Sequence, residues 1–351
     1  MNIATPIDRR HWLRVVTALP ASYFILRTAS GQNSVQTAGL INEDALAAIH
    51  KGLKYLADRQ NREGSFGAAG YARDVGVVSL AGLAFLASGS LPSRGPWGSL
   101  IDRLLDYVLN SCSASGFVSV DAADSHGPMY GHGFATTFLA EVYGMVRRPD
   151  LRAKLSKAVQ LIVDSQNDQG GWRYQPLRQD ADLSVTVCQM MALRAARNCG
   201  IVFDSQVMDR AVEYVKRCQN PDGGFMYQLP SGDSQFARSA AGAVALTSAG
   251  VYDGKEWSNA IAFLRQFQPK PDADSEMPYF FYGHYYAALA MWMAGGPLWQ
   301  NWFPAIRDNL LGLQRKDGSW YSHTVNSAEY ATAMSLLVLQ LPRGVLPILQ
   351  R

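Results

Sequence analysis

After an N-terminal stretch, the chain alternates between two kinds of apolar segment. One kind is apolar on a single face: Leu155, Val159 and Ile162 recur at helical spacing beside the charged Lys154. This pattern is typical of a helix with one side in water. The other kind, such as residues 183–196, is apolar on nearly every side and rich in small residues, which predicts a buried helix. The pattern therefore predicts an all-α protein in which half-exposed and buried helices alternate.

A short loop motif stands between the two kinds of helix. It consists of a glutamine, three variable residues, a glycine, a second glycine or a serine, and a tryptophan or phenylalanine. Glycine permits the positive backbone angles of a tight turn. We expect the aromatic ring to pack between helices and the glutamine amide to bond the backbone at a neighbouring helix end, so we interpret the motif as structural. It occurs four times, at 60–66, 166–172, 219–225 and 314–320.

The spacing of the loop glutamines shows a repeat. Gln166 and Gln219 are 53 residues apart, Gln60 and Gln166 are 106 apart, and Gln219 and Gln314 are 95 apart. Six units of about 50 residues therefore fill residues 42–341, and the second and fifth lack the full motif. We predict an N-terminal extension (1–41), one repeat domain (42–341) and a C-terminal tail (342–351).

Six buried helices that alternate with six half-exposed ones predict two concentric rings. This fold is a closed (α/α)6 toroid of six helix pairs. An open solenoid of the same pairs is the alternative, but it exposes its terminal units and usually needs polar caps. The first and last buried segments are as apolar as the middle ones, which favours closure.

Composition and charge exclude several classes of protein. Apolar residues make up 48% of the chain and the net charge is only +3. No cluster of lysine and arginine resembles a phosphate-binding stripe, which argues against nucleic acid as a partner. The cysteines form no Cys-x-x-Cys pair, and we expect them to be reduced. They are Cys112, Cys188, Cys199 and Cys218.

The N-terminal stretch contains an apolar segment from Trp12 to Leu26, interrupted by Arg14 and followed by Arg27. We expect a helix that docks on the domain, with a degraded signal peptide as the alternative. No apolar run reaches the roughly 18 residues that a membrane-spanning helix needs. A cytoplasmic or membrane-peripheral location is favoured, the latter if this segment lies on a membrane surface.

The four loops, joined to their buried helices, resemble the repeats of squalene–hopene and oxidosqualene cyclases and of the related β subunits of protein prenyltransferases. The likeness covers nearly the whole chain after Asn42 and implies a single-toroid member of this superfamily. The cyclases start their reaction with Asp-x-Asp-Asp at the start of a buried helix, where the middle acid protonates an alkene or epoxide. The matching residues are Asp180, Asp182 and Leu183. The resemblance therefore implies Asp182 as proton donor and Asp180 as its partner, with Leu183 in place of the last acid.

The prenyltransferases hold zinc through an Asp-x-Cys pair and a histidine one repeat later. His284 resembles that histidine, but the preceding unit supplies Arg238-Ser-Ala-Ala-Gly and no Asp-x-Cys. We therefore disfavour zinc-dependent prenyl transfer and predict neither metal nor cofactor.

Superposing the units by their buried helices brings polar residues to one position near the helix start. In a closed barrel these residues would ring one mouth of a central cavity, as in a binding site. They are Asp74, His132, Asp182, Arg238, His284 and Glu329. We also assign substrate contacts to Trp172, Tyr174 and Tyr282, whose aromatic faces would stabilise a carbocation by roughly 0.5 to 2 kcal/mol each. Ordinary loop and core packing is the alternative for these rings.

Asp182 and the two histidines each have a structural alternative. As a general acid, Asp182 needs a raised pKa, which an apolar surrounding and a second carboxylate at Asp180 would both provide. As a structural residue, Asp182 would cap the following helix. His132 and His284 would serve as base, metal ligand or substrate contact, or simply as hydrogen-bonded histidines at the barrel mouth.

The leading functional prediction is binding of an isoprenoid or similar apolar substrate in the central cavity, with cyclisation started by a proton from Asp182. A non-catalytic toroid that binds lipid or protein is the first alternative, and Leu183 favours it. A glycan hydrolase or lyase is the second, because double-ring helical barrels also host such enzymes. It needs paired carboxylates, which Asp74, Asp182 and Glu329 would furnish.

Overall fold

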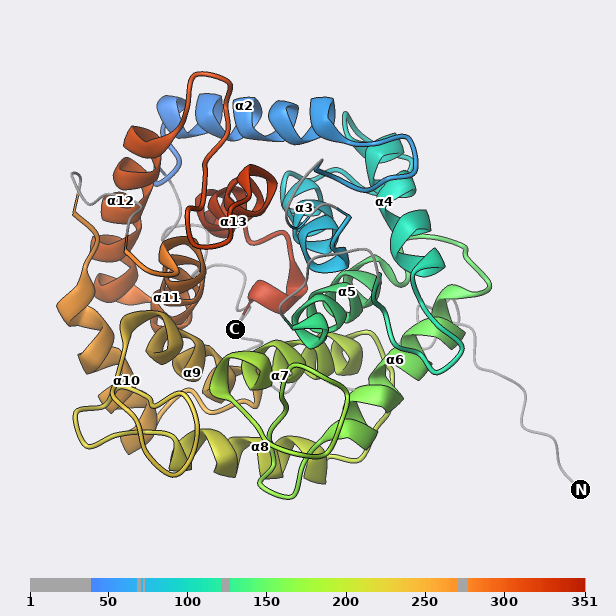
Figure 1. Cartoon of the computed structure of the whole chain (residues 1–351). Coiled ribbons are helices and arrows are strands. Elements are labelled where there is room, and N and C mark those ends of the chain that lie inside the picture. Colours follow the sequence, from blue (N-terminus) through green and yellow to red (C-terminus); the bar gives the residue numbers. More distant parts are fainter. Residues whose placement is uncertain (1–38, 68–70, 72, 121–126, 271–276, 351) are drawn as a thin grey trace, which may run out of the picture. The chain divides into compact units, whose positions relative to one another are not determined.

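The computed structural model describes residues 39–67, 71, 73–120, 127–270 and 277–350. These residues form twelve α-helices in two concentric rings (Figure 1). The outer ring consists of α2 (Glu43–Arg59), α4 (Gly98–Asn110), α6 (Leu151–Ser165), α8 (Gln206–Arg217), α10 (Lys255–Leu264) and α12 (Gly296–Leu313). The inner ring consists of α3 (Val75–Ala87), α5 (Pro128–Val142), α7 (Leu183–Asn198), α9 (Phe236–Ser248), α11 (Phe280–Ala294) and α13 (Ala328–Gln340).

The two rings differ in burial as their sequences predict. Every residue of α3 is buried, whereas α8 buries only its apolar face. Glycines let neighbouring inner helices approach closely. A Cβ atom on Gly76 would lie 3.0 Å from the Cα of Gly131 on α5, and one on Gly82 would lie 2.6 Å from the ring of Phe138. The small residues of the inner helices are therefore a packing requirement.

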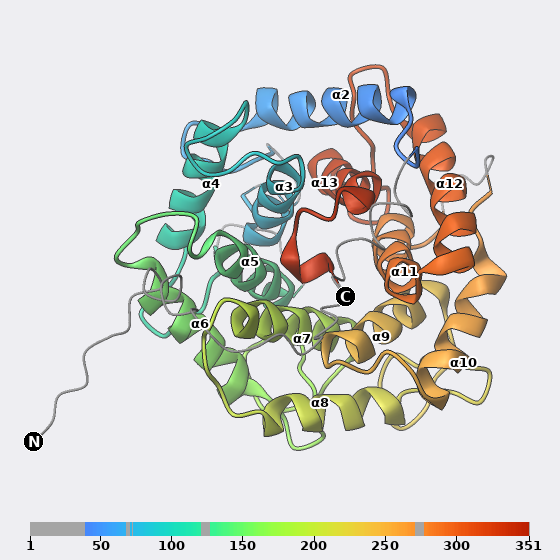
Figure 2. The same cartoon turned by 180° about the vertical axis from the view of Figure 1, so that it is seen from behind.

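Both rings close. Helix α13 packs against α3 in the inner ring, and α12 packs against α2 in the outer ring. Both views show the last and first helices side by side (Figures 1 and 2). The closed (α/α)6 toroid is confirmed and the open solenoid is excluded.

The loop glutamines link each outer helix to the next. Each side-chain amide donates to the carbonyl of its own loop glycine and to a main-chain carbonyl near the start of the next outer helix. The glutamine after α12 reaches back to α2 and so joins the two ends of the ring. The pairs are Gln60 with Leu100 (3.0 Å), Gln166 with Val207 (2.8 Å), Gln219 with Glu256 (2.8 Å) and Gln314 with Ala48 (2.9 Å).

The two units with a degenerate motif keep part of this link. In the fifth unit, the Gln268 amide lies 3.4 Å from the carbonyl of Asn301 on α12. In the second unit, Gly116 has φ +92°, and a Cβ there would lie 2.4 Å from the carbonyl oxygen of Lys157 on α6. The repeat is therefore more regular in space than in sequence.

The loop aromatics tie the outer ring to the inner ring. The indole nitrogens of Trp172 and Trp320 donate to carbonyls in the last turn of the preceding outer helix, each at 2.7 Å. Their backbone N–H groups donate to hydroxyls on the following inner helix, at Thr186 and Thr332. Phe225 uses Ser239 in the same way. Each loop therefore fixes where its inner helix begins.

The C-terminal residues close one end of the inner ring, where both views show the red end of the ribbon at the ring centre (Figures 1 and 2). After the short helices η3 (Leu341–Arg343) and η4 (Pro347–Leu349), the tail packs on α5 and α7. The Ile348 N–H donates to the Glu141 carboxylate at 3.1 Å, and Arg194 donates to the Gln350 carbonyl at 2.5 Å. Glu141 and Arg194 lie in the last turns of their helices, so the tail covers the end where inner helices finish.

The predicted N-terminal helix or signal peptide falls in residues 1–38, outside the described residues. None of the helices that the structure describes combines the length and the apolar character needed to cross a bilayer.

Two glycines give a matched test of the loop packing. Gly170 and Gly200 both have positive φ (+97° and +87°), so alanine strains the backbone at both. Only at Gly170 would the new Cβ also meet a neighbour, the carbonyl oxygen of Arg210 at 2.2 Å, whereas Gly200 has open space. We expect Gly170→Ala to lower the free energy of unfolding by about 1 to 3 kcal/mol more than Gly200→Ala does. Urea unfolding monitored by circular dichroism measures this difference, and equal losses would contradict the packing role.

The tail contact generates a pH-dependent prediction. Burial raises the pKa of Glu141 to about 7, although the Ile348 N–H and Arg194 oppose this rise. Because the folded state binds the proton more tightly than the unfolded state, the stability that protonation provides is lost as the pH rises from about 4.5 to 7. Between pH 5 and 8, wild type should lose roughly 2 kcal/mol more unfolding free energy than Glu141→Gln, which keeps an acceptor for Ile348.

Chemical unfolding at the two pH values measures this difference. Glu213→Gln, a change of the same kind at an exposed position on α8, is the control and should follow wild type. Parallel pH dependence of wild type and Glu141→Gln would show that the carboxyl is not buried as described.

Candidate active site at the mouth of the inner ring

Asp182 stands at the mouth, the end of the inner ring where the inner helices begin. Two consecutive loops hold it there: the Asp182 N–H donates to the Trp172 carbonyl at 2.9 Å, and the Leu183 N–H donates to the Tyr227 carbonyl at 3.0 Å. One carboxylate oxygen, Oδ1, accepts the Val185 N–H at 2.8 Å and caps α7. The capping role considered from the sequence is therefore present.

The second carboxylate oxygen of Asp182, Oδ2, is the atom that could take part in a reaction. Asp182 is completely buried, and its Oδ2 accepts no hydrogen bond. The nearest cation is Arg173, whose Nε lies 3.7 Å from Oδ2. Burial raises the pKa of Asp182 to about 6, against the opposing effects of the Val185 N–H, Arg173 and the nearby Tyr227 hydroxyl. This carboxyl holds a proton in mildly acidic solution, which an ordinary aspartate does not.

Arg173, Tyr174 and Tyr227 form a cluster beside this carboxyl, which we call the Arg173 cluster. The Arg173 guanidinium lies 4.6 Å from the Tyr174 ring centroid and 5.5 Å from that of Tyr227. The two tyrosine hydroxyls are 2.5 Å apart. Arg173 also pairs with Asp180, Nη1 to Oδ2, at 3.4 Å. The cluster joins both predicted acids to one cation.

Arg238 extends this group along the mouth. It lies in the first turn of α9, with its guanidinium 6.0 Å from the Tyr227 ring centroid. Burial lowers its pKa, and Asp233 and Tyr227 oppose this effect.

Three tyrosines wall the interior behind the mouth: Tyr130 on α5, Tyr282 on α11 and Tyr330 on α13. Burial raises the hydroxyl pKa of all three well above the ordinary value, and for Tyr130 and Tyr282 the charge of Asp182 adds to the rise. Each nevertheless keeps part of its surface accessible. We call the region between these three side chains the tyrosine chamber.

Tyr286 forms the floor of the tyrosine chamber. Its hydroxyl lies 3.4 Å from the Cys188 sulfur. Tyr286 belongs to α11 and Cys188 to α7, with α9 between these helices in the ring, so the side chain reaches across the interior. Both residues are buried, and the Tyr286 ring contacts the rings of Tyr282 and Tyr285. Side chains therefore fill the interior at this level.

Five of the predicted residues lie together around Asp182 and the Arg173 cluster, namely Asp180, Asp182, Tyr174, Arg238 and Tyr282. Asp74 lies at the start of α3, where its Oδ1 accepts the N–H groups of Gly76 and Val77 as a helix cap.

The expected position of His132 at the mouth is wrong. Its Nδ1 accepts the Val118 N–H and its Nε2 lies 3.1 Å from the Ala158 carbonyl, so the ring faces the outer ring between α5 and α6. In other units, the hydroxyls of Thr186 and Thr332 accept the N–H of the corresponding loop residue, and His132 Nδ1 takes that role here. Burial lowers its pKa to about 4. His132 anchors a loop.

The side chains of His284, Trp172 and Glu329 make their contacts elsewhere, although the Trp172 carbonyl accepts the Asp182 N–H. His284 packs against the rings of Phe236 and Phe280, with centroids 4.9 and 4.4 Å away, and burial lowers its pKa to about 3. Trp172 is 1% exposed and its indole nitrogen is already bonded. At the start of α13, Ser327 caps the helix rather than Glu329. His284 and Trp172 are therefore placed for packing, and Glu329 lies in the first turn of α13 without capping it.

The sequence prediction left five residues out of the site: Arg173, Tyr227, Tyr130, Tyr286 and Tyr330. A sequence cue existed for one of them, because Tyr174 and Tyr227 each stand two residues after a loop aromatic, one repeat apart. Among the described residues, no group of three or more histidine, cysteine or acidic side chains is arranged to hold a metal. All four cysteines are free.

Comparison with known proteins identifies the fold. Residues 135–275 match the family model of the prenyltransferase alpha-alpha toroid domain. No curated protein matches the sequence. Cellobiose 2-epimerase from Bacillus thermoamylovorans superposes with a TM-score of 0.61 at 12% identity, over 84% of this chain and 98% of that one. A GH76 α-mannanase from Bacteroides thetaiotaomicron gives 0.59 at 11%, over 89% and 99%.

A protein from Actinoplanes gives a TM-score of 0.58 at 15% identity, over 85% of this chain and 99% of that one. At these identities the similarity concerns the fold alone. The toroid of this chain is therefore an architecture that glycan-active enzymes also use.

Proposed function

We propose that this chain, whose toroid matches the prenyltransferase alpha-alpha toroid model over residues 135–275, binds an isoprenoid or similar apolar molecule in the tyrosine chamber. We propose further that Asp182 starts a cyclisation by protonating the substrate. The observation that carries this proposal is a buried carboxyl with a pKa of about 6 and an unbonded oxygen, beside a wall of partly accessible tyrosines.

The chamber suits an apolar guest with a developing positive charge. Tyr130, Tyr282 and Tyr330 offer ring faces, and each such face stabilises a cation by roughly 0.5 to 2 kcal/mol. The Tyr286 floor and the C-terminal tail block the far end. A ligand therefore enters from the mouth, past Asp182 and the Arg173 cluster.

The proton transfer from Asp182 to the substrate involves three changes in bonding. The Oδ2–H bond breaks, a new C–H bond forms at one alkene carbon, and the other carbon becomes a tertiary cation. The resulting Asp182 carboxylate is stabilised by Arg173, 3.7 Å away. Ring closure follows by attack of a second alkene, and loss of a proton to water ends the sequence. Because Asp182 is 0% exposed, the Arg173 cluster has to move aside before substrate reaches Oδ2.

Leu183, which replaces the last acid of the cyclase motif, is compatible with this role. Its side chain is fully buried next to Asp182. It adds apolar surroundings rather than a negative charge, and apolar surroundings by themselves raise a carboxyl pKa.

A glycan is the second candidate substrate, and the mouth provides the observation that favours it. Arg173, Arg238, Tyr174 and Tyr227 combine cations, hydroxyls and ring faces, and two carboxyls flank Arg173. Similar folds include an enzyme named as an epimerase of cellobiose and one named as a mannanase. Against this reading, Asp180 and Asp182 contact the same guanidinium rather than facing each other across a groove, as a glycosidase pair does.

Asp182→Asn tests the proposed proton donor. Asparagine keeps the helix cap, because Asn and Asp cap about equally well, but its amide cannot deliver the proton. With squalene or C15 to C20 prenyl diphosphates as substrates, we expect cyclic products from wild type and a loss of turnover of roughly 100-fold or more in the variant. Turnover by wild type should fall as the pH rises above about 6, since the proton is then lost. Gas chromatography with mass spectrometry measures the products.

Asp168→Asn is the matched control, since its side chain is 96% exposed on the same loop, and it should keep full turnover. Undiminished turnover by Asp182→Asn would remove Asp182 as donor. If wild type neither binds nor converts any isoprenoid, but releases sugar from mannan or epimerises cellobiose, the glycan reading replaces the cyclase proposal.

A further inference from the structure

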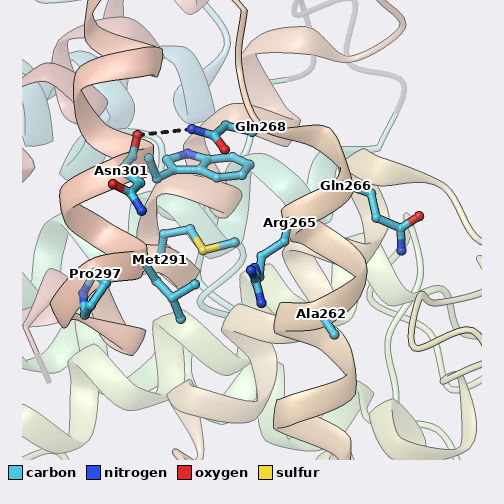
Figure 3. Close-up of a pocket in the computed structure, with 9 residues that line it drawn as sticks. Ala262, Arg265, Gln266, Gln268, Met291, Pro297 and Asn301 are labelled. Carbon is cyan, nitrogen blue, oxygen red and sulfur yellow. Dashed lines mark hydrogen bonds between the residues drawn. The ribbon is translucent and has the colours of Figure 1, made fainter.

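A groove on the outer wall lies apart from the mouth, between α10 with the short helix η2 (Arg265–Phe267) on one side and α12 on the other. It consists of two adjoining hollows of about 430 and 300 Å³ that share Ala262, Arg265 and Leu298. Figure 3 shows the larger hollow, with Arg265 on the α10 side and Met291 and Asn301 opposite. We call it the α10–α12 groove.

The floor of the α10–α12 groove is apolar. Met291 and Trp302 line the larger hollow and are buried to 0% and 3% exposure, and Ile261 and Met293 line the smaller one. Leu298 lies between the two hollows. These apolar side chains line both hollows, so an alkyl chain placed there would contact them.

The α10–α12 groove is positively charged. Arg265 is the single charged residue among those that line it. Arg265 is exposed, and no ion pair or hydrogen bond of its side chain occurs within the described part of the chain. An unpaired guanidinium above an apolar floor favours a ligand with an anionic head, because a carboxylate accepts two parallel N–H bonds from arginine.

Hydrogen-bond donors in the larger hollow are incompletely used. The indole nitrogen of Trp302 is buried and has no partner, and a buried donor without an acceptor is costly. The Gln268 amide reaches the Asn301 carbonyl only at 3.4 Å, drawn as the dashed line in Figure 3, which is longer than an ordinary hydrogen bond. A ligand carboxylate in the hollow would offer the exposed Gln268 amide a better acceptor.

We propose that the α10–α12 groove binds a free medium-chain carboxylate, a fatty-acid anion. The carboxylate pairs with Arg265 and the chain lies along Leu298, Met291 and Ile261. This site is separate from the tyrosine chamber and does not depend on the chemistry proposed for Asp182.

Isothermal titration of the full-length protein with decanoate tests the proposal. Decanol and decyltrimethylammonium, which have the same chain length but no negative charge, are the comparison ligands. We expect decanoate to bind at least tenfold more tightly than either. Arg265→Gln should weaken decanoate at least tenfold, and Arg265→Glu should reverse the preference toward decyltrimethylammonium. Leu298→Trp, which fills the space shared by the two hollows, should abolish binding.

Arg217→Gln, at an exposed position on α8, is the control and should bind decanoate as wild type does. Thermal unfolding of each variant checks that the fold is intact. Equal affinity for decanol and decanoate, an unchanged affinity in Arg265→Gln, or no binding of decanoate to wild type would each overturn the proposal.

Discussion

The loop glutamines carry the constraint on which the rest of the toroid depends. An isolated helix pair of this chain could not cover its buried helix, so each pair is stable only against its neighbours. The glutamine amide fixes that neighbour relation, because it bonds its own loop and the next outer helix at once. In two of these loops an arginine on the next helix also donates to the glutamine oxygen, Arg103 to Gln60 and Arg210 to Gln166. The same local contact therefore orients one helix pair relative to the next in each unit that has a loop glutamine.

The position of Asp182 follows from that constraint. The loop before α7 is tied to α8 through Gln166, and its Trp172 carbonyl accepts the Asp182 N–H. The next loop supplies the Tyr227 carbonyl to Leu183. Arg173 and Tyr227 thus arrive beside the carboxyl because they follow the two loop aromatics. A site of this kind uses the rigid repeat to hold a desolvated acid in place, and the raised pKa of Asp182 is the electrostatic result.

The fold could be predicted from the sequence more completely than the site, and the reasons are physical. The period of the glutamine loops and the apolar character of the inner helices both reflect a repeated local contact, so they could be found by counting residues. The prediction misplaced His132 because its Nδ1 accepts a loop N–H as a threonine hydroxyl does in another unit. A histidine and a threonine belong to different residue classes, so the sequence does not show that they are equivalent here. The Tyr286–Cys188 contact was not predicted, because it depends on how far one side chain reaches across the ring. The docking of the tail was not predicted either, because the contacts of Glu141 and Arg194 with residues 348 and 350 have no counterpart in the repeat pattern.

Closure of the ring bears on how the chain reaches its native state. The bond from Gln314 to Ala48 joins residues 266 positions apart, and α13 meets α3 across a similar separation. Contacts between units that follow each other in sequence are local and form early, whereas this seam has to wait for the whole arc. Until the seam forms, the apolar flanks of α3 and α13 face solvent at the two ends of an open arc, a state that invites another copy to bind there. Late closure makes this seam the step at which the nascent protein is most exposed to self-association, and chaperones would act most usefully there.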